Sequence, residues 1–319
     1  MNDSKYKSNK SISVFADYLL MLIFPVALSV WYYGGAAVRT LAVCLITGVV
    51  CDFFASIVIY RQFYAADLSA ICSSIMIAMM LPASVPVYIP ILASSFAVLI
   101  LKIPFGGGNN TPFVPAAAGF AFVSICFKQQ VFTYSSGRAY MSIVPLSSLL
   151  ASGGSLRLNI TNTVDILTGN IYGPMGTGCV IVFLACIIYL FFRRKDALLA
   201  TAGMIASVIV FSLVLPRSNG SLLASPVLEL SSGSLMFASV FLITDYATLP
   251  KLNRDKFILG VFCGLICMIM RKLGAYEEPV CFAVILSNAF SPLLDKAADK
   301  LIGMVSREKP EKEAAQNEQ

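Results

Sequence analysis

The chain is dominated by apolar stretches that return at short intervals from near its start to near its end. Only 13% of its 319 residues are charged, whereas 58% are hydrophobic. Because a soluble domain carries about a quarter charged residues, this deficit indicates that lipid is the solvent of most of the chain. The sequence therefore predicts an all-α integral membrane protein, whose helices satisfy their own backbone groups in lipid.

Ten of these stretches are candidate membrane-spanning helices. Several are shorter than the roughly 20 residues that a straight span needs. The fifth, eighth and tenth contain proline or polar residues, so we expect broken or protein-enclosed helices there. The ten candidates run near residues 16–33, 36–60, 67–82, 86–102, 112–128, 178–193, 197–215, 232–249, 256–271 and 278–294.

Basic residues beside these stretches predict the orientation of the chain. Lysines before the first span, the clusters Arg193–Lys195 and Lys251–Lys256, and the basic residues after the last span would all face the cytoplasm. Ten spans then place both termini in the cytoplasm and the polar segment 129–177 outside. Arg271 and Lys272 are the main violation of this pattern, because they fall at the outer end of the ninth span.

The chain divides into two halves that resemble each other. A stretch ending at Pro82 is similar to one ending at Pro250, and Pro115 and Pro279 open the fifth and tenth spans at a similar offset. Five spans in each half would make a duplication an inverted repeat, which places a functional site near the midplane. Helix composition alone is the alternative explanation. The predicted organisation is a cytoplasmic segment 1–14, one membrane domain 15–296 with halves 15–128 and 178–296 and an external loop 129–177, and a cytoplasmic tail 297–319.

Nine cysteines and no histidine limit the metal chemistry open to this chain. Most of the cysteines fall in apolar runs, where they act as small hydrophobic residues. Cys263 and Cys267 share a helix face, but two thiols are too few for a four-thiolate iron–sulfur site. We therefore predict no metal site, and the lack of histidine excludes a haem held by that residue. Nucleic-acid binding is not expected either, since no basic run is interleaved with aromatic residues.

A glycine-rich turn joins the fourth and fifth candidate spans. Gly106 and Gly107 permit positive φ angles and a close approach of the backbone to a ligand. The start of the next helix offers free N–H groups, which suit an anion such as a phosphate. A tight turn between two spans is the alternative interpretation.

Three carboxylates within or beside apolar spans are candidates for function. Asp52 lies well inside the second span and Asp67 near the start of the third, where they would suit a cation or proton path. The alternative for Asp67 is a helix N-cap, which its position before Leu68 and Ser69 favours. Asp245 ends an apolar span, and its alternatives are a helix cap or a pairing with Lys251 or Arg254.

Several motifs, in the same order along the chain, resemble a family formed by the D subunit of the Rnf electron-transport complex and the B subunit of the sodium-pumping NADH:quinone oxidoreductase. The turn with Gly106, Gly107 and Asn110 is similar to the family's Gly-Gly-x-Gly-x-Asn-x-Phe-Asn-Pro-Ala, although Val114 stands where the family has asparagine. The segment around Asp245 resembles Thr-Asp-Pro-Val-Thr-x-Pro. The resemblance implies that these residues of the turn and Asp245 contribute to cofactor binding.

The resemblance extends from about residue 15 to 296 and implies a ten-helix bundle with an inverted repeat. It also implies a membrane subunit of a complex of the bacterial cytoplasmic membrane. Such a complex passes electrons between reduced ferredoxin and NAD and translocates Na⁺ or H⁺, so the implied partners are the other Rnf-type subunits. Asp52 and Asp67 would then lie on the ion path.

One position departs from the family in a way that affects its chemistry. The family's external loop carries FMN on a threonine that precedes Pro-Leu, and here Val144 precedes Pro145 and Leu146. The segment Val164–Thr177 resembles the end of the same loop and fixes the alignment. Because valine has no hydroxyl, covalent FMN is not expected, and FMN or riboflavin would bind noncovalently. A non-redox transporter or channel, or a scaffold subunit, on the same fold is the alternative function.

Overall fold

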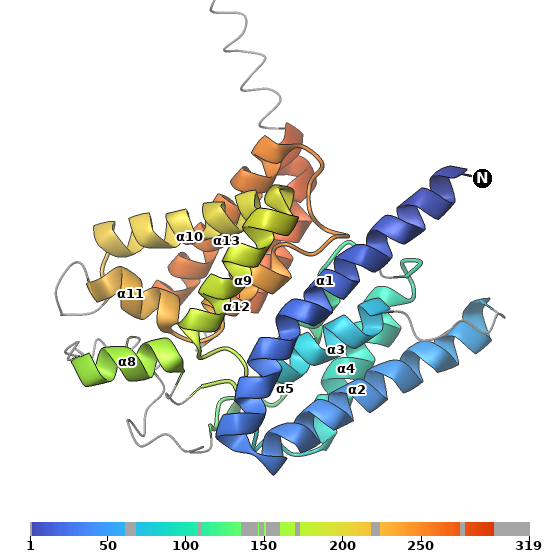
Figure 1. Ribbon diagram of the computed structural model, residues 1–319, viewed down its shortest axis with the longest axis horizontal. Helices are drawn as coiled ribbons and strands as arrows, with labels where there is room; N and C mark the ends of the chain where they lie inside the picture. Colours follow the sequence, from blue (N-terminus) through green and yellow to red (C-terminus); the bar gives the residue numbers. More distant parts are fainter. Residues whose placement is uncertain are drawn as a thin grey trace, which may run out of the picture.

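The computed structural model describes residues 2–60, 68–107, 110–134, 160–169, 173–217, 224–274 and 278–296, together with Leu146 and Leu150. All regular structure in these ranges is helical, and none of the described residues forms a strand. The helices form two groups that lie side by side, with the first half of the chain in blue to cyan and the second in green to red (Figure 1). The predicted all-α class is thus confirmed.

The first half contains long helices and shorter, enclosed ones. Two of the helices continue directly into π-helical turns, a form that often occurs at functional sites. The α3 helix packs against α1, α2 and α5. The elements are α1 (Asn2–Tyr33), α2 (Gly35–Ala55) with η1 (Ser56–Tyr60), α3 (Leu68–Met80), α4 (Tyr88–Phe96) with η2 (Ala97–Lys102), α5 (Pro115–Cys126) and α6 (Lys128–Val131).

In the second half, α10 and α13 form the most extensive helix pair. Glycines allow the two backbones to approach, as small residues do at membrane helix interfaces. A Cβ added to Gly260 would lie 2.1 Å from the carbonyl oxygen of Ala200. The elements are α8 (Ile160–Thr168), α9 (Val180–Arg193), α10 (Lys195–Val214), α11 (Ala224–Ser231), α12 (Leu235–Phe237), η3 (Ala238–Leu242), α13 (Asn253–Leu273) and a last helix over 280–296.

Each of the ten predicted stretches contains a helix, but the helices differ in length. By length and composition, three described helices are able to cross a membrane: Ser13–Tyr33, Gly35–Val58 and Lys195–Val214. The pair Ser225–Ser231 and Leu235–Leu242 would be a fourth, bent by 74°. This bend lies at the start of the predicted eighth stretch, 232–249, and α5, in the fifth, is a short helix buried along most of its length. These helices indicate a multi-pass membrane protein.

The distribution of side chains is that of a protein in lipid. Large apolar side chains such as Ile46, Phe54, Val58 and Phe192 are exposed, whereas many serines and several charged groups are buried. Exposed apolar surface of this extent would be unusual on a soluble monomer. Polar groups inside the bundle find hydrogen bonds there that lipid cannot offer.

The two halves of the chain meet at two places where a helix end reaches the start of a helix from the other half. At the first, the α5 crossing, Asp245 lines the same small cavity as Pro115 at the start of α5. At the second, the 280–296 crossing, the Sγ of Cys281 lies 3.6 Å from the Sδ of Met80 at the end of α3. The two contacts are reciprocal: in each, a helix end from one half meets a helix start from the other, and the halves change roles between the two contacts.

Candidate functional site

The cavity at the α5 crossing brings together elements that are far apart in sequence. It is lined by α1, α3, the start of α5 and the segment after η3, and its polar side chains are Ser69, Ser73 and Asp245. Its volume is about 20 Å³, which is room for about one water molecule. The end of the family-like glycine-rich motif, at Val114 and Pro115, thus meets the family-like Asp245.

Asp245 is the only carboxylate among the described residues that line this cavity, and it lies beyond η3 in the segment that leads to α13. The backbone amides of Ala247, Tyr246 and Thr248 and the guanidinium of Arg194 lie near this buried carboxyl. Its Oδ2 atom is enclosed, and the described residues offer it no hydrogen bond. A buried carboxylate oxygen without a donor is costly, so this oxygen is suited to bind a proton, a cation or a water.

Neighbouring side chains fix the backbone that carries Asp245. The hydroxyl of Tyr18 donates to the carbonyl oxygen of Thr244 and lies 3.2 Å from its Oγ1. The guanidinium of Arg194 lies 5.0 Å from the centre of the Tyr18 ring and interacts electrostatically with Asp245. Arg254, one of the two cations expected to pair with Asp245, instead donates to Asp255 at 3.1 Å.

The start of α5 adds a positive electrostatic potential to the cavity. Val114 is extended and Pro115 occupies the first turn, so the helix begins abruptly at the cavity. The N–H groups of a first turn have no acceptor within their own helix and favour negative charge.

The predicted turn residues lie elsewhere. Gly106 and Gly107 have φ angles of 90° and 100°, and Asn110 is exposed, with its Nδ2 3.6 Å from a Cβ added to Gly106. The amide of Gly107 donates to the carbonyl of Lys102 at 3.1 Å. These are the contacts of a tight turn, and none of the three residues lines the Asp245 cavity.

Asp52 is paired with Lys102, a cation that the sequence analysis did not single out. The Nζ of Lys102, at the end of η2, donates to Asp52 Oδ1 at 2.9 Å, and the lysine is buried. The aspartate of the second span is therefore ion-paired between α2 and η2. The other two predicted positions, Asp67 and Val144, lie outside the described residues.

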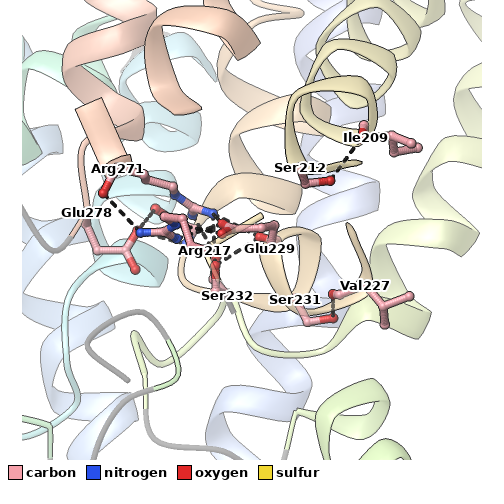
Figure 2. A network of polar contacts seen from close by, with 10 residues as sticks. Ile209, Ser212, Arg217, Val227, Glu229, Ser231, Ser232, Arg271 and Glu278 are labelled. Carbon is pink, nitrogen blue, oxygen red and sulfur yellow. Dashed lines mark hydrogen bonds and ion pairs between the residues drawn. The ribbon is translucent and has the colours of Figure 1, made fainter. Parts of the chain in front are cut away.

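A second polar cluster lies near the 280–296 crossing. Glu229 of α11 accepts two hydrogen bonds from Arg217, at 2.6 and 2.7 Å, and one from Arg271 at 3.0 Å. Arg271 also donates to the hydroxyl and carbonyl oxygens of Ser232, both at 2.8 Å. Figure 2 shows these side chains converging on Glu229. Arg271 violates the positive-inside pattern because it is a buried ion-pair partner and not a surface anchor.

Sequence reasoning missed Lys102, Arg194 and Glu229 as members of these polar sites. Each lies at or near a helix end, where a charged residue is usually interpreted as a cytoplasmic anchor or as a solvent-exposed side chain. The available signal was the low charge content itself, because a rare charge beside an apolar span must find a partner in the bundle.

The described cavity does not fit a flavin. Sites for cofactors of that size have volumes of roughly 300–1,000 Å³, whereas the cavity beside Asp245 has about 20 Å³. Its polar groups are one carboxylate and two serines, and Val114 replaces the amide of the family motif.

A multi-helix membrane protein with a buried carboxylate where two interrupted helices meet belongs to the class of ion-translocating membrane subunits and transporters. The model of the NQR2, RnfD, RnfE family matches residues 5–303. The chain belongs to this family.

Curated relatives are similar over nearly the whole chain. The D subunit of the ion-translocating oxidoreductase complex of Ectopseudomonas mendocina is 27% identical, covering 90% of each chain. The D subunit of the Na⁺-translocating ferredoxin:NAD⁺ oxidoreductase complex of Acetobacterium woodii is 25% identical over 96% of this chain and 95% of its own. The proton-translocating counterpart of Clostridium ljungdahlii is 26% identical over 91% of each.

Proposed function

We propose that the chain is the D-type membrane subunit of an Rnf-type complex that couples electron transfer between ferredoxin and NAD to the movement of Na⁺ or H⁺. Its partners are then the other subunits of that complex. The observation that carries the proposal is the enclosed Oδ2 of Asp245 at the α5 crossing. An acid held between interrupted helices of two halves is what an alternating-access ion site requires.

The proposal includes the architecture expected from the sequence. Ten spans in two inverted halves, with both termini on the cytoplasmic side of a bacterial inner membrane, are supported by the reciprocal crossings at Asp245 and Cys281. The division into a membrane domain over 15–296, with a loop 129–177 between the halves, follows from the same arrangement.

Ion movement in this proposal depends on the carboxylates. Asp245 binds the transported cation or proton beside Ser69 and Ser73, because hydroxyl and carboxylate oxygens are preferred by hard cations. Asp52 and Asp67 belong to the path by their position in the chain, and Lys102 balances the charge of Asp52 between passages.

The test is ion uptake by inverted membrane vesicles that contain the complete complex. Driven by reduced ferredoxin and NAD⁺, vesicles with Asp245→Asn should lose at least about tenfold in uptake of ²²Na⁺ or of protons. Assembly of the complex should be kept. Asp196→Asn is the control, because its carboxylate is exposed (71%), forms only a long contact of 3.9 Å with Lys256, and does not line the cavity. Unchanged uptake in Asp245→Asn with an assembled complex would contradict the proposal.

A non-redox transporter or scaffold subunit on this fold is the second candidate. It is favoured by Val144, which offers no hydroxyl for FMN, and by the small volume of the Asp245 cavity. Intact mass and in-gel flavin fluorescence of the purified chain separate the possibilities. We expect no added FMN mass, and a covalent adduct would contradict the prediction that Val144 prevents covalent attachment of FMN. Val144→Thr, co-expressed with a flavin transferase, should become labelled if the loop still presents the recognition sequence.

A further inference from the structure

Arg194 lies in the turn between α9 and α10 and differs from the two basic residues beside it. Arg193 and Lys195 are exposed, and Arg193 donates to Asp17 at 3.3 Å. The side chain of Arg194 instead reaches into the bundle, where its NH1 group is enclosed and the described residues offer it no acceptor. Because a surface anchor keeps its charge in water or at the headgroups, the role of Arg194 lies inside the protein.

Contacts through Tyr18 place this charge beside the Asp245 site. The guanidinium of Arg194 lies 5.0 Å from the centre of the Tyr18 ring, and Tyr18 is fully buried. The hydroxyl of the same tyrosine donates to the carbonyl oxygen of Thr244, the residue before Asp245. Since an aromatic ring attracts a positive charge without neutralising it, Arg194 acts on Asp245 electrostatically and leaves its Oδ2 atom open.

We propose that Arg194 makes the Asp245 site selective for monovalent cations. The carboxylate and the guanidinium together carry no net charge, so one bound Na⁺ brings this buried pair to +1 and a divalent ion brings it to +2. Repulsion from Arg194 grows in proportion to the charge of the ion, and a divalent cation is therefore disfavoured twice as strongly. This inference rests on the proposed ion-translocating function and names the class of ion that the same site takes.

The oxygen atoms of the cavity do not by themselves provide this selectivity. One carboxylate and the hydroxyls of Ser69 and Ser73 line it, and oxygen ligands of these kinds also suit Ca²⁺. The fixed charge of Arg194 is the feature of the site that distinguishes the two classes of ion. It also favours release, because a transported ion must bind weakly enough to leave.

Two other roles for Arg194 lead to different expectations. A direct ion pair would occupy Asp245, but Arg194 NH1 and Asp245 Oδ2 each have no hydrogen-bond partner among the described residues. A purely structural role, in which the guanidinium only packs on Tyr18, would mean that losing Arg194 damages the site and weakens the binding of every ion. Removal of a repelling charge has the opposite effect, since it strengthens binding.

The test is the binding of ²²Na⁺ to the purified full-length chain in choline buffer, with unlabelled Na⁺ and Ca²⁺ as competitors. In Arg194→Gln the affinity for Na⁺ should rise about tenfold and that for Ca²⁺ about a hundredfold, because the repulsive energy doubles with the charge of the ion. Arg194→Lys keeps the charge and should resemble the wild type. Arg193→Gln is the matched control, since it removes a positive charge that is 62% exposed from the same turn.

Unchanged affinities for both ions in Arg194→Gln, or weaker binding of both, would overturn the inference. Asp245→Asn separates this failure from that of the proposed function, because loss of binding in that variant supports the Asp245 site whatever Arg194 does. Absence of Na⁺ binding in every variant would contradict the inference together with the Na⁺ form of the proposed function. In the wild type, Ca²⁺ at the concentration of Na⁺ should displace little label, and efficient displacement would overturn the inference even if no variant folds.

Thermal unfolding in Na⁺-free buffer tests the electrostatic interaction without a bound ion. Arg194→Gln should lower the midpoint less in the Asp245→Asn background, by at least about 2 °C, because the carboxylate that the guanidinium stabilises is then absent. Additive shifts of the two substitutions would contradict the inference and leave the Asp245 site of the proposed function untouched.

Discussion

The cluster around Glu229 and the cavity around Asp245 solve the problem of buried charge in different ways. At Glu229 two arginines saturate one carboxylate, and the guanidinium groups also bind Ser232 and the carbonyl of Arg271. At Asp245 one carboxylate oxygen is left open, and its nearest cation, Arg194, lies over the ring of Tyr18. The first arrangement holds helices together, whereas the second keeps binding capacity free at some cost in stability.

The largest effect is expected from Glu229→Gln, which removes the carboxylate that pairs with the buried Arg217 and Arg271. Removal of one partner of a buried pair costs about 3–5 kcal/mol. The midpoint of thermal unfolding in detergent should fall accordingly, followed with a thiol-reactive dye because most of the described cysteines are buried. Asp196→Asn is the control. A midpoint within error of the wild type would show that the cluster contributes no stability.

The second-largest loss of stability is expected from a substitution at the break between α11 and α12. Gly233→Ala places a methyl group against Glu278 at a φ of +63°, and strain plus overpacking cost about 2–4 kcal/mol. Gly34→Ala is a matched control, because Gly34 has a φ of +60° and no atom within 4 Å of an added Cβ. The unfolding midpoints of the two variants should differ. Equal losses would indicate that the side chain of Glu278 moves to make room for the methyl group.

The ion pair of Asp52 and Lys102 allows a third test of whether pairing a buried carboxylate stabilises the protein, with a smaller expected effect. Lys102→Met removes the cation from Asp52, and we expect a loss of about 2–3 kcal/mol, because the aspartate side chain is 14% exposed. Asp52→Asn in the same chain should recover part of the loss, as a double-mutant cycle would measure. Additive losses would contradict a direct interaction.

The smallest and opposite effect is expected from Asp245→Asn. One oxygen of this buried carboxyl has no hydrogen-bond donor among the described residues, which costs stability. At pH 7 the variant should unfold at the same temperature as the wild type or higher, by about 1 kcal/mol or 2–4 °C. A lower midpoint would place Asp245 among the stabilising residues and weaken the contrast with Glu229.

Sequence reasoning located the helices better than the contacts between them. Runs of apolar residues predicted a helix at each of the ten stretches, because hydrophobic length is a local property. The Asp245 motif was also recognised locally, but its cavity depends on Ser69, Pro115 and Tyr18, which lie far away in the chain. Arg271 was a violation of the topology rule for the same reason, since its partner Glu229 lies on another helix.

The sequence by itself determined that lipid surrounds this chain, that its described backbone is helical, and that Val144 cannot carry an ester-linked flavin. These follow from side-chain chemistry and local hydrophobicity. Only the tertiary structure decided which charges are neutralised and which remain open. Asp52 and Glu229 meet cations, whereas Asp245 and Glu278 each keep one enclosed oxygen free. The reason is that the electrostatic state of a buried group depends on neighbours that folding brings from other helices.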